Sequence, residues 1–237
     1  MILCIDAVLT DNELKTIATK LKTASFVDGK TTAGWYAKQV KHNAQIQPGE
    51  IAESARSLIL TALRRNALFQ MAAYPKAIRP PLISRYDVGM GYGTHVDNAL
   101  MGGSAPLHGD SQHSDSQQSD LMRTDLSLTL FLNSPEDYEG GELVIEDALG
   151  HHPFKLPAGA MVLYPATTLH RVEPVTQGTR LVAVTWVQSL VRNAGDRELL
   201  FELDTARQPL FQQYGKTPEF DQITKCHANL LRRWAEP

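Results

Sequence analysis

The feature that most restricts the fold of this chain is a series of short apolar stretches after Pro80-Pro81. Each stretch is rich in β-branched and aromatic residues, and glycine or proline residues separate it from the next. Short strands without helical segments between them disfavour an alternating βαβ fold and favour a sandwich, jelly roll or barrel. The expected strands are residues 82–88, 124–133, 142–147, 153–156, 161–164, 170–174 and 180–189.

Helical patterns flank this β-rich region on both sides. Thr10 and Glu13 predict a capping box at the start of a helix, in which each side chain bonds to the other residue's backbone. A second helix is expected from about Gly49, and one strand in the stretch between the two helices, where Trp35, Tyr36 and Val40 lie among polar residues. From Asn193 the pattern becomes helical again. We therefore expect three regions: an N-terminal helical and strand region at 1–79, a core at 80–189, and a C-terminal helical appendage at 190–237.

Composition narrows the class of protein further. A chain of 237 residues, 43% of them hydrophobic, is sufficient for one sizeable globular domain. The formal net charge of −3 favours neither nucleic acid nor an anionic membrane as a partner. Cys4 and Cys226 form no C-x-x-C pair, and the apolar start of the chain ends at Asp6 without the pattern of a signal peptide. We expect a cytoplasmic protein with no membrane-spanning segment.

The string His95-Val96-Asp97 is the strongest candidate for a metal site. An iron ion that must also bind a bidentate cosubstrate and O₂ needs three ligands on one face, which two imidazoles and one carboxylate supply. Side chains at positions i and i+2 of a strand project to the same face, so this spacing suits two ligands. The third ligand is expected from a distant strand beside the first, and His170, after the apolar stretch 161–164, is the candidate.

Two further H-x-D pairs, beginning at His108 and His113, lie in a segment with little apolar character. Residues 102–120 are rich in Ser, Gln, Gly, Asp and His, so we expect a mobile loop with solvated side chains. A lid that orders on substrate binding and an insertion without a role are both open for this loop.

Arg180 precedes the apolar stretch of an expected strand. Burying its guanidinium there is costly unless an anion meets it. The distal carboxylate of a dicarboxylic acid would suit the planar fork of donors, and a salt bridge to a nearby Asp or Glu is the alternative.

In this order and spacing, the residues resemble the iron- and 2-oxoglutarate-dependent dioxygenases of the prolyl-4-hydroxylase type. Longer strings sharpen this to a resemblance to the bacterial PKHD-type hydroxylases over most of the chain. These strings are Arg85-Tyr86-Asp87, DLSLTLFLN at 125–133, GGELVIE at 140–146, HRVEPV at 170–175 and WVQS at 186–189.

The resemblance implies a mainly β fold, with a double-stranded β-helix (jelly-roll) core, N-terminal helices and a short C-terminal helical appendage. It implies hydroxylation of a small-molecule or peptide substrate with O₂, and release of succinate and CO₂. Fe(2+) would be held by His95, Asp97 and His170, 2-oxoglutarate would be bound by Arg180, and L-ascorbate would serve as a reductant. Related halogenases carry a small residue in place of the carboxylate, so Asp97 favours hydroxylation.

The resemblance also suggests further contacts. Tyr86 stands where relatives have a tyrosine near the cosubstrate. Phe131 stands where some animal relatives have a tyrosine that helps to hold the distal carboxylate, so the second donor is expected from Thr129 on the same face, or is missing. Tyr92 and Asn98 are candidate substrate contacts.

Three other functions remain open at this point. A jelly roll with a degenerate site could bind iron or 2-oxoglutarate without turnover. A cupin-like dioxygenase would not use 2-oxoglutarate, and a zinc hydrolase could use the same ligands; neither of these requires Arg180. The fold class does not identify the substrate. Trp186 is expected in the core more than in the pocket, and a homodimer is compatible with the C-terminal pattern.

Overall fold

The computed structural model describes residues 1–32, 36–102 and 121–237. Trp35 and the two H-x-D pairs of the expected loop lie outside these ranges. The helices are α1 (Asp11–Leu21), α2 (Glu50–Arg65), α3 (Ala67–Ala73), α4 (Ala194–Tyr214) and α5 (Pro218–Trp234), with short 3₁₀ helices η1 (Gly29–Thr32), η2 (Ala37–Gln39) and η4 (Pro135–Asp137). The strands are β1 (Leu3–Ile5), β2 (Phe26–Asp28), β3 (Lys41–His42), β4 (Ala44–Ile46), β5 (Pro75–Ile78), β6 (Leu82–Tyr86), β7 (Gly91–His95), β8 (Leu100–Met101), β9 (Met122–Arg123), β10 (Leu126–Phe131), β11 (Tyr138–Gly140), β12 (Leu143–Asp147), β13 (Gly150–Phe154), β14 (Met161–Pro165), β15 (His170–Val172), β16 (Val175–Gly178) and β17 (Arg180–Ser189).

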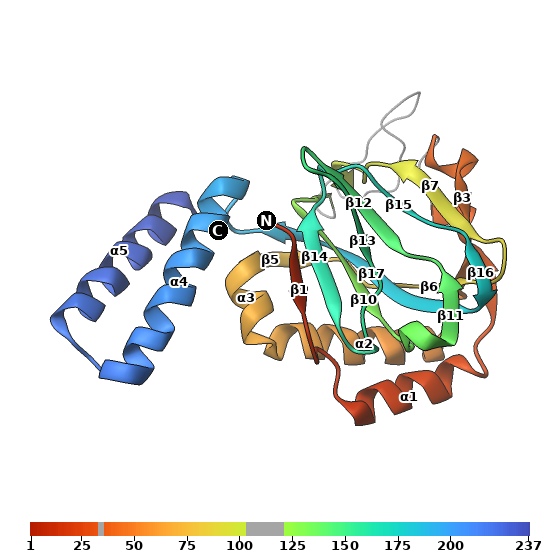
Figure 1. The fold of residues 1–237 in the computed structure, drawn as a ribbon, viewed down its shortest axis with the longest axis horizontal. Coiled ribbons are helices and arrows are strands. Elements are labelled where there is room, and N and C mark those ends of the chain that lie inside the picture. The colour runs from red at the N-terminus through yellow and green to blue at the C-terminus, as the bar shows by residue number, and fades with distance from the viewer. Residues whose placement is uncertain (33–35, 103–120) are drawn as a thin grey trace.

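Two sheets and a layer of helices make up the body of the protein (Figure 1). The larger sheet has the strand order β1-β14-β10-β17-β6-β4-β2, and β5 also pairs with β17. The smaller sheet has the order β13-β12-β15-β7-β3. Side chains from both sheets form one apolar cluster between them, and α1, α2 and α3 pack a second cluster onto the outer face of the larger sheet. The expected mainly β core with flanking helices is confirmed.

Strand β10 contributes side chains to both apolar clusters. All six of its residues are buried. Leu126, Leu128 and Leu130 belong to the cluster under the helices, whereas Phe131 belongs to the cluster between the sheets. Because side chains alternate along a strand, Ser127 and Thr129 share the inner face with Phe131. The string LSLTLF therefore directs its leucines to the helices and its polar residues to the space between the sheets.

Several expected elements agree with the structure. Thr10 caps α1: its hydroxyl accepts the backbone N–H of Glu13 at 3.3 Å, and the capping box is complete. Helix α2 begins after Gly49, and the side chain of Asn193 caps α4. All seven predicted strands are present, although β13 spans Gly150–Phe154 and so begins earlier than the predicted stretch.

The stretch between α1 and α2 contains more structure than the one expected strand. It holds three short strands, β2, β3 and β4, and residues 37–39 form the 3₁₀ helix η2. In the glycine-rich stretch before His95, Gly89 has a φ of +82°, whereas Gly91 and Gly93 lie within β7. Glycine is required at 93 because a Cβ would lie 2.8 Å from the Cβ of Val40 on the neighbouring segment.

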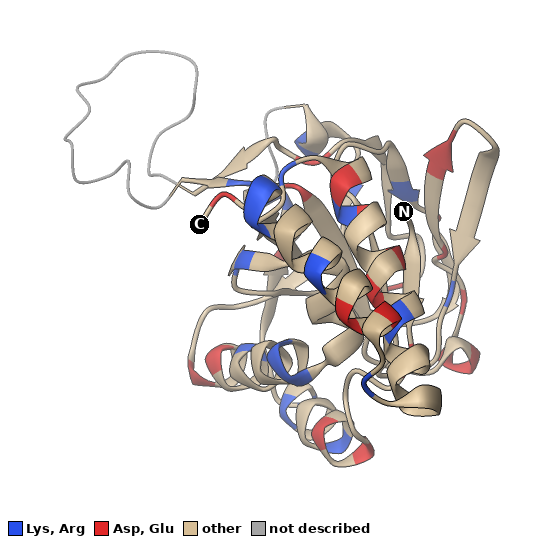
Figure 2. Cartoon of the chain, turned by 90° about the vertical axis from the view of Figure 1, so that its left-hand side faces the viewer, with Lys and Arg blue, Asp and Glu red and all other residues tan. Residues whose placement is uncertain are grey.

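The helical hairpin of α4 and α5 stands beside the β core (Figure 1). Helix α4 contacts α3, and the rings of Phe211 and Phe220 join the two helices with centroids 4.9 Å apart. The buried His227 pairs its Nε2 with the hydroxyl of Tyr74, the residue that ends α3, at 3.0 Å. Figure 2 shows basic and acidic residues interspersed on the helices at this end of the molecule. Whether the three predicted regions are separate domains stays a prediction.

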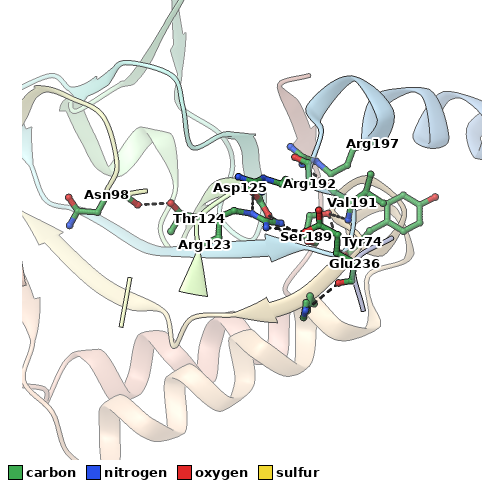
Figure 3. Close-up of polar contacts among 11 residues, drawn as sticks. Tyr74, Asn98, Arg123, Thr124, Asp125, Ser189, Val191, Arg192, Arg197 and Glu236 are labelled. Carbon is green, nitrogen blue, oxygen red and sulfur yellow. Dashed lines mark hydrogen bonds and ion pairs between the residues drawn. The ribbon is translucent and has the colours of Figure 1, made fainter. Parts of the chain in front are cut away.

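Polar contacts join the end of the hairpin to the core (Figure 3). Arg123 donates from Nε to Asp125 at 2.7 Å and from Nη1 to Glu236 at 3.2 Å. The same Asp125 accepts the backbone N–H of Ser189 at 2.8 Å. At the start of α4, Arg197 donates to the backbone carbonyl of Val191 at 2.7 Å. These contacts hold the hairpin against the strands that follow the candidate metal site.

Within the described part of the chain, none of the helices has the length and apolar character that a bilayer-spanning segment requires.

The contact between His227 and Tyr74 predicts that acid weakens the attachment of the hairpin. Burial is the main cause that lowers the pKa of His227 below its usual value of 6.5. The unfolded chain therefore binds this proton at a higher pH than the folded chain, so stability falls as the pH drops through the unfolded value. Between pH 7.5 and 5.5, the melting temperature of the wild type should fall further than that of His227→Gln, measured by circular dichroism. Parallel curves for the two proteins would contradict this role.

Candidate metal centre

The structure brings together His95, Asp97 and His170. His95 ends β7 and is directly opposite His170, which begins β15. One ligand atom from each of the three residues lies within 4.8 Å of the others, and His170 Nε2 is 3.8 Å from Asp97 Oδ2. Asp97 lies just beyond the end of β7, so strand alternation alone does not position it. The set of two imidazoles and one carboxylate on neighbouring backbone segments fits Fe(II).

Backbone carbonyls orient both imidazoles. His95 Nδ1 donates to the carbonyl of Gly93 at 2.9 Å, and His170 Nδ1 donates to that of Thr168 at 3.1 Å. Each Nε2 is thereby the nitrogen left to bind a metal. Burial, followed by the nearby His170, lowers the pKa of His95 to about 4. Its ring is therefore neutral at physiological pH, which is the form that a metal requires.

A serine from the larger sheet holds the carboxylate of Asp97. The hydroxyl of Ser127, on the inner face of β10, donates to Asp97 Oδ2 at 2.6 Å. Ser127 is completely buried, so water does not compete for this bond. Since the backbone at Asp97 is no longer in the strand, this bond across the two sheets is what fixes the carboxylate. A polar residue within an apolar stretch is the one sign of this contact in the sequence.

A β-bulge places Tyr92 beside the cluster. Tyr92 and His95 are three residues apart along β7. Their partners on β15, Val172 and His170, are only two residues apart. This extra residue shifts the alternation, so Tyr92 and His95 share a face. Their rings stack with centroids 3.7 Å apart at 18°. Tyr92 therefore lies next to the candidate metal site, and its contact with a substrate stays a prediction.

Asn98 follows the cluster and is exposed. Its backbone carbonyl accepts the hydroxyl of Thr124 at 2.5 Å, which ties the segment after Asp97 to the start of β10 (Figure 3). A substrate contact through the Asn98 side chain stays a prediction. Trp186 is directly opposite Ser127, so it faces the space between the sheets and not the helices. Its indole nitrogen is buried without a hydrogen-bond partner among the described residues, and whether Trp186 belongs to the core or the pocket stays open.

Arg180 is buried in an aromatic setting on the same inner face. Only 1% of the residue is exposed, and its guanidinium carbon lies 4.9 Å from the ring centroid of Tyr86 and 5.7 Å from that of Phe131. Nε and Nη1 have no hydrogen-bond partner within the described ranges, and no described carboxylate forms an ion pair with Arg180. The salt-bridge alternative is thus not found there. A buried guanidinium with free donors fits the distal carboxylate of 2-oxoglutarate.

A glycine turn makes room for this arginine. Gly141, at φ +67°, belongs to the string GGELVIE. A Cβ at this position would lie 3.1 Å from Arg180 Cδ and 3.2 Å from Tyr138 Cε2. Both the backbone angle and the space therefore favour glycine.

Two hydroxyl groups are candidates for the second donor, and they differ in their contacts. Thr129 is buried on the inner face of β10, and a hydrogen bond joins it to Tyr164. The hydroxyl of Tyr138 is buried, interacts with Arg180 and has no hydrogen bond to any other described group. Burial raises the pKa of Tyr138, and its interaction with the positively charged Arg180 opposes that shift. The sequence pattern did not single out Tyr138, because β11 is a short strand whose position beside Arg180 depends on the folded turn.

Two segments of the chain match sequence profiles of known families. Residues 81–188 match the 2OG-Fe(II) oxygenase superfamily, and residues 195–236 match the PKHD-type hydroxylase C-terminal domain. The first match contains the three clustered residues and Arg180. Fold and site together define a 2-oxoglutarate-dependent Fe(II) oxygenase.

Full-length relatives identify the family within this class of oxygenases. A PKHD-type hydroxylase from Acaryochloris marina is 56% identical over 238 residues, which cover 100% of this chain and 100% of that protein. A second, from Thermosynechococcus vestitus, is 55% identical over 237 residues with the same coverage. The chain belongs to the PKHD-type hydroxylases. The resemblance seen in the sequence motifs is confirmed, as are Fe(2+) and 2-oxoglutarate as the cofactors of the family.

A solved structure supports the fold. The prolyl hydroxylase from Trichoplax adhaerens, in complex with a hypoxia inducible factor peptide fragment, matches with a TM-score of 0.51 at 12% identity. The match covers 78% of this chain and 82% of that one. The expected jelly-roll core is therefore confirmed.

Removing the hydroxyl that holds Asp97 should weaken metal binding. Ser127→Ala should lower the affinity for Fe(II) about 10- to 100-fold, which is typical for the loss of a group that orients a metal ligand. Anaerobic titration with Fe(II) measures this.

Thr185→Val is the matched control for Ser127→Ala. Thr185 is also fully buried in the larger sheet, and its hydroxyl donates to the carbonyl of Arg79 at 2.6 Å, away from the cluster. This variant should lose stability and keep its Fe(II) affinity. Equal Fe(II) affinities in the wild type and Ser127→Ala would show that Ser127 does not position Asp97.

Proposed function

We propose that this chain hydroxylates a small-molecule or peptide substrate, consuming O₂ and 2-oxoglutarate and releasing succinate and CO₂. One observation carries the proposal: a cluster of two histidines and an aspartate faces the same space between the sheets as a buried arginine with unpaired donors. A zinc hydrolase or a cupin-like dioxygenase has no use for that arginine. Catalysis, as opposed to binding alone, is supported by the family of hydroxylases to which the chain belongs.

His95, Asp97 and His170 would hold Fe(II) and leave the remaining positions open. When bound, Fe(II) and 2-oxoglutarate supply the O₂-dependent oxidation that protein side chains cannot perform. The chain contributes orientation: Gly93 and Thr168 present the two Nε2 atoms, and Ser127 fixes the carboxylate. The apolar cluster between the sheets limits the access of water to the site.

Arg180 would bind the distal carboxylate of 2-oxoglutarate through charge-assisted hydrogen bonds. The rings of Tyr86 and Phe131 flank the guanidinium and exclude water from it. The second donor is best supplied by Tyr138, because its buried hydroxyl interacts with Arg180 and with no other described group, whereas that of Thr129 bonds to Tyr164. This assignment replaces Thr129 as the favoured donor.

Fe(II) binding together with 2-oxoglutarate gives the first test. Under anaerobic conditions the wild type should develop the visible metal-to-ligand charge-transfer band, and His170→Ala should not. Arg180→Met should need about 100-fold more 2-oxoglutarate, because each hydrogen bond to a charged group contributes about 1.5–3 kcal/mol.

Arg85→Met is the matched control for Arg180→Met. Arg85 lies on the neighbouring strand β6, is partly exposed and pairs with Asp87. Its replacement should leave the dependence on 2-oxoglutarate unchanged. A wild-type protein that binds Fe(II) tightly without the band would contradict the proposed use of 2-oxoglutarate.

The two candidate second donors predict different variant effects. Tyr138→Phe should raise the 2-oxoglutarate concentration needed for half-saturation about 10-fold, which corresponds to one hydrogen bond to a charged group. Thr129→Val should have little effect on this value, measured from the same absorption band. The opposite ranking of the two variants would assign the donor to Thr129.

Three further expectations stay predictions: L-ascorbate as a reductant, a homodimer, and a cytoplasmic location. Production of succinate in the presence and absence of ascorbate addresses the first, and sedimentation addresses the second.

A further inference from the structure

Lys41 occupies the inner face of the smaller sheet, at its open edge. Strand β3 is the last strand of that sheet and pairs with β7, so that Lys41 is directly opposite Tyr92. The next residue, His42, points outward and is exposed, whereas Lys41 is only 6% exposed. Tyr92 shares the inner face of β7 with His95, so Lys41, opposite Tyr92 on the neighbouring strand, lies on the same face as His95 and His170.

The ammonium group of Lys41 is held by neutral groups. Nζ donates to the hydroxyl of Thr32 at 2.9 Å and lies 5.4 Å from the ring centroid of Tyr92, the ring that stacks on His95. No carboxylate of the described residues comes within ion-pair distance of Nζ. A buried cation without an anion is costly, and such groups usually have a ligand or a charged partner.

The lysine keeps much of its charge at neutral pH. Burial lowers its pKa to about 8, and the more distant carboxylates of Asp97 and Asp28 oppose that shift. Asp28 is exposed to water, and Asp97 belongs to the metal cluster. Neither of them therefore neutralises the ammonium group.

The charges of the loaded site leave Lys41 unmatched. Fe(II) carries two positive charges and Arg180 one. These three are balanced by the two negative charges of 2-oxoglutarate and the single negative charge of Asp97. With both cofactors bound, the positive charge of Lys41 has no counterpart between the sheets among the described residues. One negative charge on the substrate would restore the balance.

We propose that Lys41 binds a carboxylate group of the substrate and thereby directs the neighbouring carbon atoms toward the iron. This inference rests on the proposed function, because it assumes that Fe(II) and 2-oxoglutarate fill the rest of the site. Tyr92 forms the surface between the lysine and His95. The substrate class is thus a carboxylic acid, either a small molecule or a peptide with an acidic group.

Phenylacetate and its neutral analogue phenylacetamide are suitable probes. The protein is loaded with Mn(II) and saturating 2-oxoglutarate, and NMR measures the relaxation of the ring protons of each probe. Mn(II) is paramagnetic, so only a probe bound close to the metal relaxes faster. We expect phenylacetate to increase the relaxation rate of its ring protons in a saturable way. Phenylacetamide should bind with an affinity at least about 10-fold lower.

Lys41→Met removes the charge with little change in volume, and it should weaken phenylacetate binding at least about 10-fold. Lys38→Met is the matched control, because Lys38 is an exposed lysine on η2 a few residues away. It should bind the probe as the wild type does. If Lys41→Met does not fold, Lys41→Gln takes its place.

Several outcomes would overturn the inference. These are equal relaxation by the acid and the amide, undiminished binding in Lys41→Met, or no saturable effect of phenylacetate. Methyl phosphate that binds in place of phenylacetate would overturn the assignment of a carboxylate. A missing charge-transfer band in the Fe(II) experiment would instead remove the proposed function, so the two failures are distinguishable.

Discussion

The direct pairing of His95 with His170 across β7 and β15 is the contact on which the rest of the site depends. It brings two imidazoles together from positions far apart in the sequence, and the neighbouring strands supply everything else. Ser127 reaches Asp97 from the facing sheet, and Arg180 lies at the opposite end of β17 from Trp186, on the same inner face. The space between the sheets therefore contains the proposed metal centre at one end and the buried Arg180 at the other, and hydrogen-bonded strands connect them.

Arg180 and Lys41 are buried cations without an ion pair among the described residues, and their surroundings differ. Arg180 is surrounded by aromatic rings and has donors without partners, which suits a cosubstrate that always carries the same carboxylate. Lys41 is bound by one hydroxyl at the edge of the sheet, close to Tyr92. A planar fork of donors fits one geometry, whereas an ammonium group accepts an anion from several directions. The first residue thus suits a constant ligand and the second a more variable one.

The sequence predicted what short-range chemistry determines. The capping box at Thr10, the strand 180–189 and the H-x-D spacing were all visible from neighbouring residues. What was missed depends on contacts across sheets or on exceptions to alternation. Tyr92 reaches His95 only through a bulge, and nothing in the local string reveals that Val40 packs against Gly93 in β7. The placement of Ser127, Tyr138 and Lys41 also follows from strand order, which a single sequence does not give.

The two faces of strand β10 have different functions. Its leucines contact the helices, and the residues between them face the site, so neighbouring positions are subject to different constraints. A substitution at 126, 128 or 130 changes how firmly the helical layer is attached, while one at 127, 129 or 131 changes what the site can bind. Because the two faces share a backbone but few side-chain contacts, substrate preference in such a protein can diverge among relatives while the attachment of the helical layer is preserved.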